Sequence, residues 1–126
     1  SISAYVLNEG LITHQEDSKV LQEIKQIIIE NITNKKLNVM FIAESMNLST
    51  RSLYRKLANT NHSSISDLIR DSRLHIAENL LLQTKKTIAE IIEESGFNNR
   101  ASFYKAFTLK HNCSPTEYRG AKTSEL

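Results

Sequence analysis

The sequence predicts an all-α fold of about seven helices, arranged as two helix-turn-helix subdomains that a long connector helix joins. The first observation is composition, since 126 residues with only 3 Gly and 1 Pro favour helix over sheet. The second is the spacing of apolar residues, which follows a helical period through most of the chain. The third is a near-repeat, in which the pattern of residues 42–57 returns at residues 91–107.

Composition and charge narrow the class of protein. A hydrophobic content of 40% can fill one compact domain or two small subdomains. Residues 1–50 contain four basic and six acidic residues, whereas residues 51–126 contain 12 basic and eight acidic ones. This weak asymmetry of charge is compatible with binding to nucleic acid but does not by itself indicate that partner. The single Cys113 excludes an internal disulfide and disfavours a zinc site. No apolar run reaches the roughly 20 residues of a membrane span, and the first residues lack the pattern of a signal peptide. We therefore expect a cytoplasmic protein and no membrane contact from this segment.

The first third of the chain predicts a linker and two helices. Residues 1–16 have no sustained period, so we interpret them as a linker or as the edge of an upstream domain. Apolar residues at helical spacing predict an amphipathic helix from Asp17 to near Asn34. Asn38 can cap a short helix that runs through Met46.

That short helix is the first half of the first helix-turn-helix. Asn47 tolerates the positive φ that the turn requires. Ser49 can then cap a second helix from Thr50 to about Asn59. Capping-box patterns follow at two places, where Ser64 and Asp67 open the connector and Thr87 and Glu90 open the second motif.

The second motif follows the same order of elements. Its first helix ends at Gly96, and its second helix, over about residues 100–111, is capped by Asn99 or Asn98. A capping pattern around Pro115 begins a closing helix. The expected organisation is a linker over residues 1–16, a first subdomain over 17–63, a connector over 64–83, a second subdomain over 84–120 and a tail over 121–126.

Apolar spacing also predicts which face of the second helix in each motif is exposed. Leu53 and Leu57 are four residues apart, as are Phe103 and Phe107, and both pairs should face the interior. The opposite faces carry polar side chains that can bind DNA, namely Ser49, Thr50, Arg51, Tyr54 and Arg55 in the first copy, and Asn98, Asn99, Arg100, Ser102 and Lys105 in the second. Arg can donate two hydrogen bonds to guanine, and Ser, Asn, Tyr and a helix N-terminus can bind phosphate or base edges.

Other interpretations of these faces remain open. One such helix could simply be a solvated surface, but two copies with the same turn residues are less easily explained that way. A helical protein-protein interaction module is the alternative, with Tyr54, Tyr104 and the arginines contacting a protein. A salt titration of binding to random duplex DNA distinguishes the two functions, because negligible affinity at low salt would favour a protein partner.

Several conspicuous residues do not indicate chemistry. His111 and Cys113 lack a second pair of ligands, so a surface histidine and a half-buried thiol are expected rather than a metal site. His62 and His75 have no nucleophile arrangement around them, and we expect neither an enzyme nor a cofactor. Arg73 could bind phosphate, an acidic neighbour or a helix end.

The region from about residue 37 to 119 resembles the DNA-binding domain of AraC/XylS-type transcription regulators. The residues that carry the resemblance are the first motif, the connector sequence Arg73-Leu74-His75-Ile76-Ala77-Glu78-Asn79-Leu80-Leu81, then Ile88-Ala89-Glu90-Ile91, Gly96-Phe97, Phe103, Phe107, Ser114-Pro115 and Tyr118-Arg119. By motif position the resemblance implies DNA contacts from Arg51, Tyr54, Arg55, Arg100, Ala101, Ser102 and Lys105, of which Ala101 offers only a methyl group. The leading helix also resembles the entry to such domains in response regulators and hybrid two-component sensors.

The resemblance also implies binding partners. In this family the second helix of each motif is the recognition helix, and the two recognition helices would enter successive major-groove segments of a promoter or operator, about 34 Å apart. RNA polymerase and an upstream sensory or dimerisation domain are further expected partners. The chain departs from the family pattern by placing Asn47, Asn61 and Asn112 where Gly is usual, and Ser64 where Pro is usual. Asn tolerates the left-handed backbone, so the turns should persist.

Overall fold

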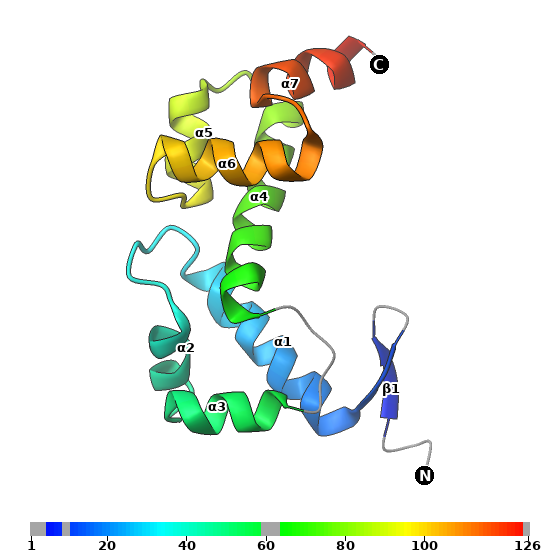
Figure 1. Cartoon of the computed structure of the whole chain (residues 1–126), viewed down its shortest axis with the longest axis vertical. Coiled ribbons are helices and arrows are strands. Elements are labelled where there is room, and N and C mark those ends of the chain that lie inside the picture. Colours follow the sequence, from blue (N-terminus) through cyan, green and yellow to red (C-terminus); the bar gives the residue numbers. More distant parts are fainter. Residues whose placement is uncertain (1–4, 9–10, 59–63, 125–126) are drawn as a thin grey trace. The chain divides into compact units, whose positions relative to one another are not determined.

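The computed structural model describes residues 5–8, 11–58 and 64–124. Within these ranges it contains seven helices and one antiparallel hairpin, and the two helix-turn-helix motifs joined by a long helix are confirmed (Figure 1). The elements are β1 (Tyr5–Asn8), β2 (Leu11–His14), α1 (Gln15–Glu30), α2 (Val39–Ser45), α3 (Thr50–Leu57), α4 (Ile65–Gln83), α5 (Ile88–Ser95), α6 (Arg100–His111) and α7 (Pro115–Ser124).

The chain divides into two compact units. Unit 1 contains the described residues up to Asn31 together with Lys36–Leu68, and unit 2 contains Ile32–Lys35 and the described residues from Ile69 onward. The helix α4 therefore begins in unit 1 and continues in unit 2. None of the helices in the described part of the chain combines the length and the apolar character that crossing a bilayer requires.

The N-terminal hairpin was not predicted from the sequence. Strands β1 and β2 pair antiparallel, with Tyr5 opposite His14 and Asn8 opposite Leu11. This segment lacks a helical period and was therefore predicted to be a linker or a domain edge. The sequence signal for the hairpin is two short runs of β-favouring residues separated by two residues.

Unit 1 packs α1 against both helices of the first motif. Helices α1, α2 and α3 contact one another, as Figure 1 shows. Leu53 and Leu57 of α3 are buried, as their spacing predicted. The other buried apolar residues of this unit are Leu21, Ile24, Ile28, Leu37, Ile42, Ala43 and Ile65.

Helix α1 ends at Glu30, four residues before the predicted end near Asn34. The Asn31 side chain turns back and donates a 2.9 Å hydrogen bond to the carbonyl of Ile27. The backbone N–H of Asn31 also donates to the carbonyls of Ile27 and Ile28, at 3.1 and 3.2 Å, so backbone and side chain together satisfy the end of the helix. The prediction placed the end near Asn34 because the apolar period continues to Ile32.

Unit 2 has an aromatic core between α4, α5, α6 and α7. Phe103 and Phe107 are fully buried, which confirms their predicted inward orientation. The Phe103 ring lies 5.2 Å from Phe97 and 5.7 Å from Phe107, measured between centroids. Tyr118 of α7 meets Phe107 edge-on at 5.3 Å, so the closing helix completes this core.

The predicted caps are present. Asn38, Ser49 and Ser64 each accept a hydrogen bond from the amide three residues later, at 2.9, 3.0 and 3.1 Å. Thr87 and Glu90 form a complete capping box. Of the two candidates before α6, Asn99 is the cap, with a 2.8 Å bond from the Ser102 amide. Helix α3 ends at Leu57, and the predicted boundary at Asn59, together with Asn61 and His62, lies outside the described residues.

The turns have the predicted left-handed backbone. Asn47, Gly96 and Asn112 have φ values of 58°, 92° and 55°. Gly96 is also confined by its neighbours, because a Cβ atom there would lie 2.0 Å from the carbonyl oxygen of Ile32. The second turn therefore requires glycine for two independent reasons, which are the positive φ and the close approach of the Ile32 carbonyl.

Two arginines of unit 2 bind backbone carbonyls. Arg73 is 8% exposed, and its guanidinium donates to the carbonyls of Ile32 and Asn34 at 3.2 and 3.3 Å. Burial lowers the pKa of Arg73. Of the roles left open for Arg73, the structure supports binding to the chain that follows a helix end. Arg119 acts similarly at the end of α4, where it donates to Leu81 at 2.9 Å and to Thr84 at 3.3 Å.

Candidate nucleic-acid interface

The N-caps provide a common register for α3 and α6. Ser49 caps α3 and Asn99 caps α6, so residues can be compared by their distance from the cap. In this register Leu53 matches Phe103 and Leu57 matches Phe107, and all four are buried. The same register aligns the exposed sides of the two helices, where Thr50 matches Arg100, Arg51 matches Ala101, Tyr54 matches Tyr104 and Arg55 matches Lys105.

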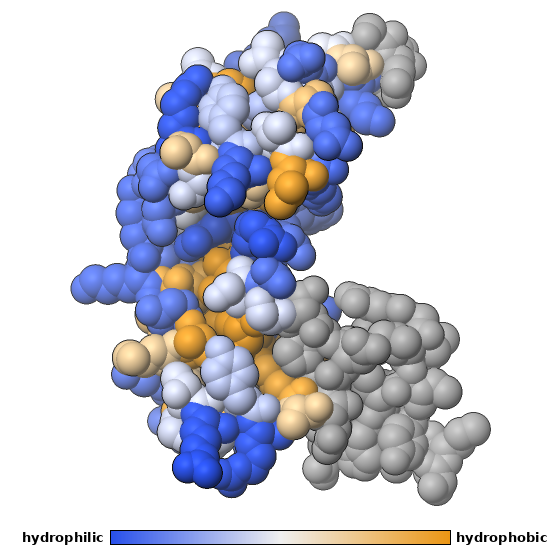
Figure 2. Space-filling view, viewed as in Figure 1, coloured by the Kyte–Doolittle hydropathy of each residue, from blue (hydrophilic) through white to orange (hydrophobic). Residues whose placement is uncertain are grey.

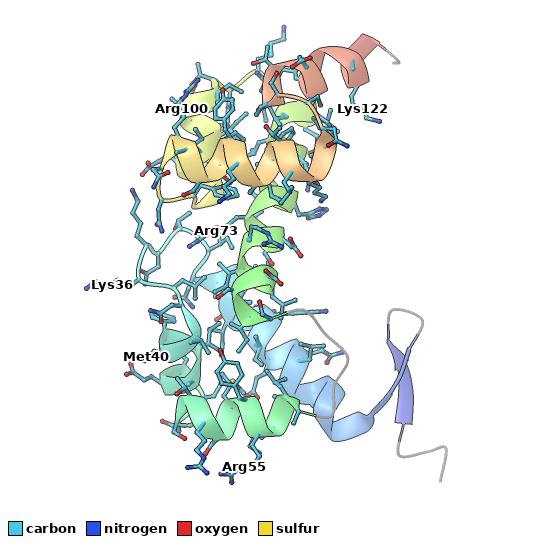
Figure 3. All side chains as sticks on the ribbon, in the orientation of Figure 1. Lys36, Met40, Arg55, Arg73, Arg100 and Lys122 are labelled. Carbon is cyan, nitrogen blue, oxygen red and sulfur yellow. The ribbon has the colours of Figure 1, made fainter. Side chains whose placement is uncertain are left out.

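The outer face of α3 carries the predicted cationic residues. Arg51 and Arg55 are exposed, and Tyr54 is 52% exposed. Figure 3 shows Arg55 projecting from α3 away from α1 and α2, and the outer surface of α3 is mostly hydrophilic in Figure 2. The hydroxyl of Ser49 is engaged in the cap, where it accepts from the Ser52 amide. This face can therefore offer two guanidinium groups and a phenol to a ligand.

The outer face of α6 is polar as well. Asn98, Ala101, Ser102 and Lys105 are exposed, and the side-chain oxygen of Asn99 is engaged in the cap. The structure thus exposes the predicted residues of each copy on the surface of its own unit, except for Thr50, which is half-buried. Each recognition helix also begins with amide groups at its N-terminus, which attract phosphate.

Arg100 is held against its own helix. Its Nη2 donates a 2.9 Å hydrogen bond to the hydroxyl of Tyr104, and its Cζ lies 4.7 Å from the centroid of that ring. Tyr104 was named only in the protein-interaction alternative and not among the predicted DNA contacts. The i, i+4 spacing of Arg100 and Tyr104 was the sequence signal for this pairing.

Glu78 of α4 binds the C-terminal end of α6. The Glu78 side chain is 12% exposed, and one of its oxygens lies 2.7 Å from both Lys110 Nζ and His111 Nε2. The His111 ring packs against Phe107 and Tyr118, at centroid distances of 4.5 and 4.6 Å. The prediction that His111 is a surface residue is therefore wrong, because a carboxylate 33 positions away and two aromatic rings cover it. Cys113 is half-buried, as expected.

Glu78 gives unit 2 a predictable response to acid. Burial tends to raise the pKa of this carboxyl, but hydrogen bonds and charges from Lys110 and His111 outweigh it, so the pKa is lowered. A lowered pKa contributes stability above the unfolded-state value, and this contribution is lost as the pH falls through the folded-state value. We expect Glu78→Gln to cost about 1–3 kcal/mol near pH 7 and much less at pH 3.

Thermal unfolding between pH 3 and pH 7 measures this difference. The matched control is Glu93→Gln, which removes an exposed carboxylate from α5. If the loss of stability in Glu78→Gln were the same at both pH values, the ion pairing of Glu78 would not be its source.

Within the described part of the chain, no three His, Cys, Asp or Glu side chains gather as a metal site would require. The exposed arginine, lysine, serine and tyrosine side chains of the two faces can donate hydrogen bonds, and the basic ones carry positive charge.

A family model described as a helix-turn-helix domain matches residues 42–121, more than half of the chain and both motifs. The chain belongs to the AraC/XylS-type helix-turn-helix family. Domains of this family bind DNA in transcription regulation, which confirms the function predicted from the sequence. The individual contact residues stay predictions.

Two curated proteins are similar to this chain. The Msm operon regulatory protein of Streptococcus mutans is 31% identical over 121 residues, which cover 92% of this chain and 43% of that protein. The regulatory protein SoxS of Escherichia coli K12 is 28% identical over 108 residues, or 86% of this chain and 97% of SoxS. The chain therefore spans less than half of the first relative but nearly all of the second.

A solved structure of similar fold is the C-terminal domain of AraT, a response regulator from Geobacillus stearothermophilus. It aligns with a TM-score of 0.74 and 28% identity, covering 81% of this chain and 84% of that one. The AraC/XylS-type architecture of two motifs thus has an experimentally determined counterpart.

Proposed function

We propose that this domain recognises a specific double-stranded DNA site, with α3 and α6 entering successive major-groove segments. The observation that carries the proposal is the shared cap register, in which both helices bury matching apolar residues and expose a basic residue six positions after the cap, Arg55 in α3 and Lys105 in α6. A helix presented by its N-terminal turns is the usual geometry for reading base edges.

The two helices differ in what they offer to bases. In α3 the guanidinium groups of Arg51 and Arg55 follow the cap by two and six residues. In α6 the matching positions hold Ala101 and Lys105, and the guanidinium of Arg100 lies one residue after the cap. The two halves of the DNA site should therefore differ in sequence, since Arg favours guanine and a methyl group favours thymine.

The remaining roles are proposed from the similar proteins described above and from the composition of this chain. The protein would act in the cytoplasm as a transcription regulator without catalytic activity, as part of a chain whose other domains sense a signal or dimerise. RNA polymerase is a proposed partner at the promoter. The similarity to AraT supports an output role in a two-component system.

Selection of bound duplexes from a random oligonucleotide pool tests the proposal directly. The expected result is an asymmetric motif of two parts centred about 10 base pairs apart, with affinity that falls steeply as salt rises. A single short motif would contradict the use of both helices. Absence of enrichment at low salt would favour the protein-interaction alternative.

Replacing one arginine separates base reading from charge. We expect Arg51→Ala to lower affinity for the selected site by about 1–3 kcal/mol and to relax preference at one base pair. Lys19→Ala is the control, because it removes one exposed positive charge from α1, outside the proposed interface. Fluorescence anisotropy on the selected site and its single-base variants provides the measurement. Equal losses on every sequence would identify Arg51 as a phosphate contact instead.

A further inference from the structure

Two tyrosines occupy the same position in the two recognition helices but have different surroundings. Tyr54 and Tyr104 both lie five residues after their N-caps. One turn before Tyr54 stands Thr50, and Tyr54 is 52% exposed. One turn before Tyr104 stands Arg100, whose guanidinium binds the hydroxyl and covers the ring of Tyr104.

The Tyr104 ring is itself anchored. It meets Phe103 edge-on, with centroids 5.6 Å apart and an interplanar angle of 86°. Tyr104 is partly buried and packs against the aromatic core of unit 2. A ring fixed in this way is a firm support for a cation lying over it.

The pairing leaves most of the arginine available. A guanidinium has five N–H donors, and the Tyr104 hydroxyl uses one of them. The others can still make a two-bond contact with guanine. Because the hydroxyl oxygen accepts from Arg100, its own proton remains free to donate. An exposed arginine loses side-chain conformational entropy when it binds a ligand. Pairing with Tyr104 in the free protein orders Arg100 beforehand and so reduces that loss.

We propose that Tyr104 is a positioning residue that orients Arg100, and thereby sets the base preference of α6. The inference rests on the proposed DNA-binding function and adds to it a residue outside the predicted contacts. It also distinguishes the two helices, because Thr50 stands before Tyr54 at the position that Arg100 holds before Tyr104.

The test uses Tyr104→Phe, which keeps the ring and its contact with Phe103 but removes the hydroxyl. Binding is measured by anisotropy on the selected site and on its single-base variants, for the wild type, Tyr104→Phe, Arg100→Ala and the double variant. We expect Tyr104→Phe to lose preference at the base pair that Arg100→Ala affects, with affinity about fivefold lower. The double variant should bind no worse than Arg100→Ala alone, because both changes remove one interaction.

Tyr54→Phe is the matched control and should leave preference at that base pair unchanged. Thermal unfolding of Tyr104→Phe should match the wild type, so that a loss of folding is not mistaken for a loss of positioning. Preference retained in Tyr104→Phe but lost in Arg100→Ala would overturn the inference while leaving the proposed function intact. Affinity lowered equally on all sequences would also overturn it, by making the hydroxyl a phosphate contact.

A measurement on the free domain tests the same inference without DNA. The order parameter of the Arg100 Nε–H group, from ¹⁵N relaxation, should be high in the wild type and lower in Tyr104→Phe. Equal values would overturn the inference, by showing that the Tyr104 hydroxyl does not hold Arg100. If the wild type bound no duplex, the proposed function would fail, and the relaxation result would still decide whether the two side chains are paired.

Discussion

Gly96→Ala is expected to destabilise unit 2 by about 3 kcal/mol or more. Gly96 has φ of 92°, and an L-residue in that region costs about 1–3 kcal/mol by itself. The new methyl group would also lie 2.0 Å from the Ile32 carbonyl oxygen and 3.0 Å from Arg73 Nε. Since those two atoms are hydrogen-bonded to each other, any shift that relieves the overlap also disturbs a buried arginine.

Urea unfolding followed by circular dichroism measures this effect, and hydrogen exchange assigns it to unit 2. Gly120→Ala in α7 is the control, because a Cβ atom there has no neighbour within 4 Å. That change should be neutral or should stabilise the helix by up to about 1 kcal/mol. A Gly96→Ala variant within about 1 kcal/mol of the wild type would contradict the close approach of Ile32.

Phe107→Ala is expected to cost about 3–5 kcal/mol. The Phe107 ring is fully buried, and its neighbours Phe103, Tyr118 and His111 come from both α6 and α7. Those rings are themselves held by other contacts, so they cannot collapse fully into the space that the substitution leaves. DNA binding should fall together with stability, because α6 depends on this ring for its position.

The control for Phe107→Ala is Leu109→Ala in the same helix. Leu109 is 77% exposed, so its truncation should change stability by less than about 0.5 kcal/mol. Thermal and urea unfolding of the two variants give the comparison. Similar unfolding midpoints for both would mean that Phe107 does not face the core.

Local chemistry explains why much of the fold could be predicted. Caps such as Ser49, Thr87 and Asn99 act on amides within one turn, so their spacing alone identifies helix starts. Burial of Phe103 and Phe107 followed from their four-residue spacing. The exposed faces of the candidate site followed from the same period, since a helix that buries one side exposes the other.

The features that could not be predicted depend on residues distant in sequence. Arg73 binds a carbonyl 41 positions away, and His111 binds a carboxylate 33 positions away. A single sequence contains no signal for such pairs. The pairing of Arg100 with Tyr104 is different, because the two side chains are four residues apart on one helix and their spacing alone is a signal for it.

The two hydrogen bonds of Arg73 limit where the second motif can be cut from the chain. A fragment beginning at Ile69 would keep the guanidinium but lose its acceptors, the carbonyls of Ile32 and Asn34. A truncated polypeptide of that kind would hold an uncompensated cation in its interior. A version of the second motif that folds by itself therefore has to include Ile32–Lys35, or a replacement for its carbonyls, although this segment precedes the whole first motif in the chain.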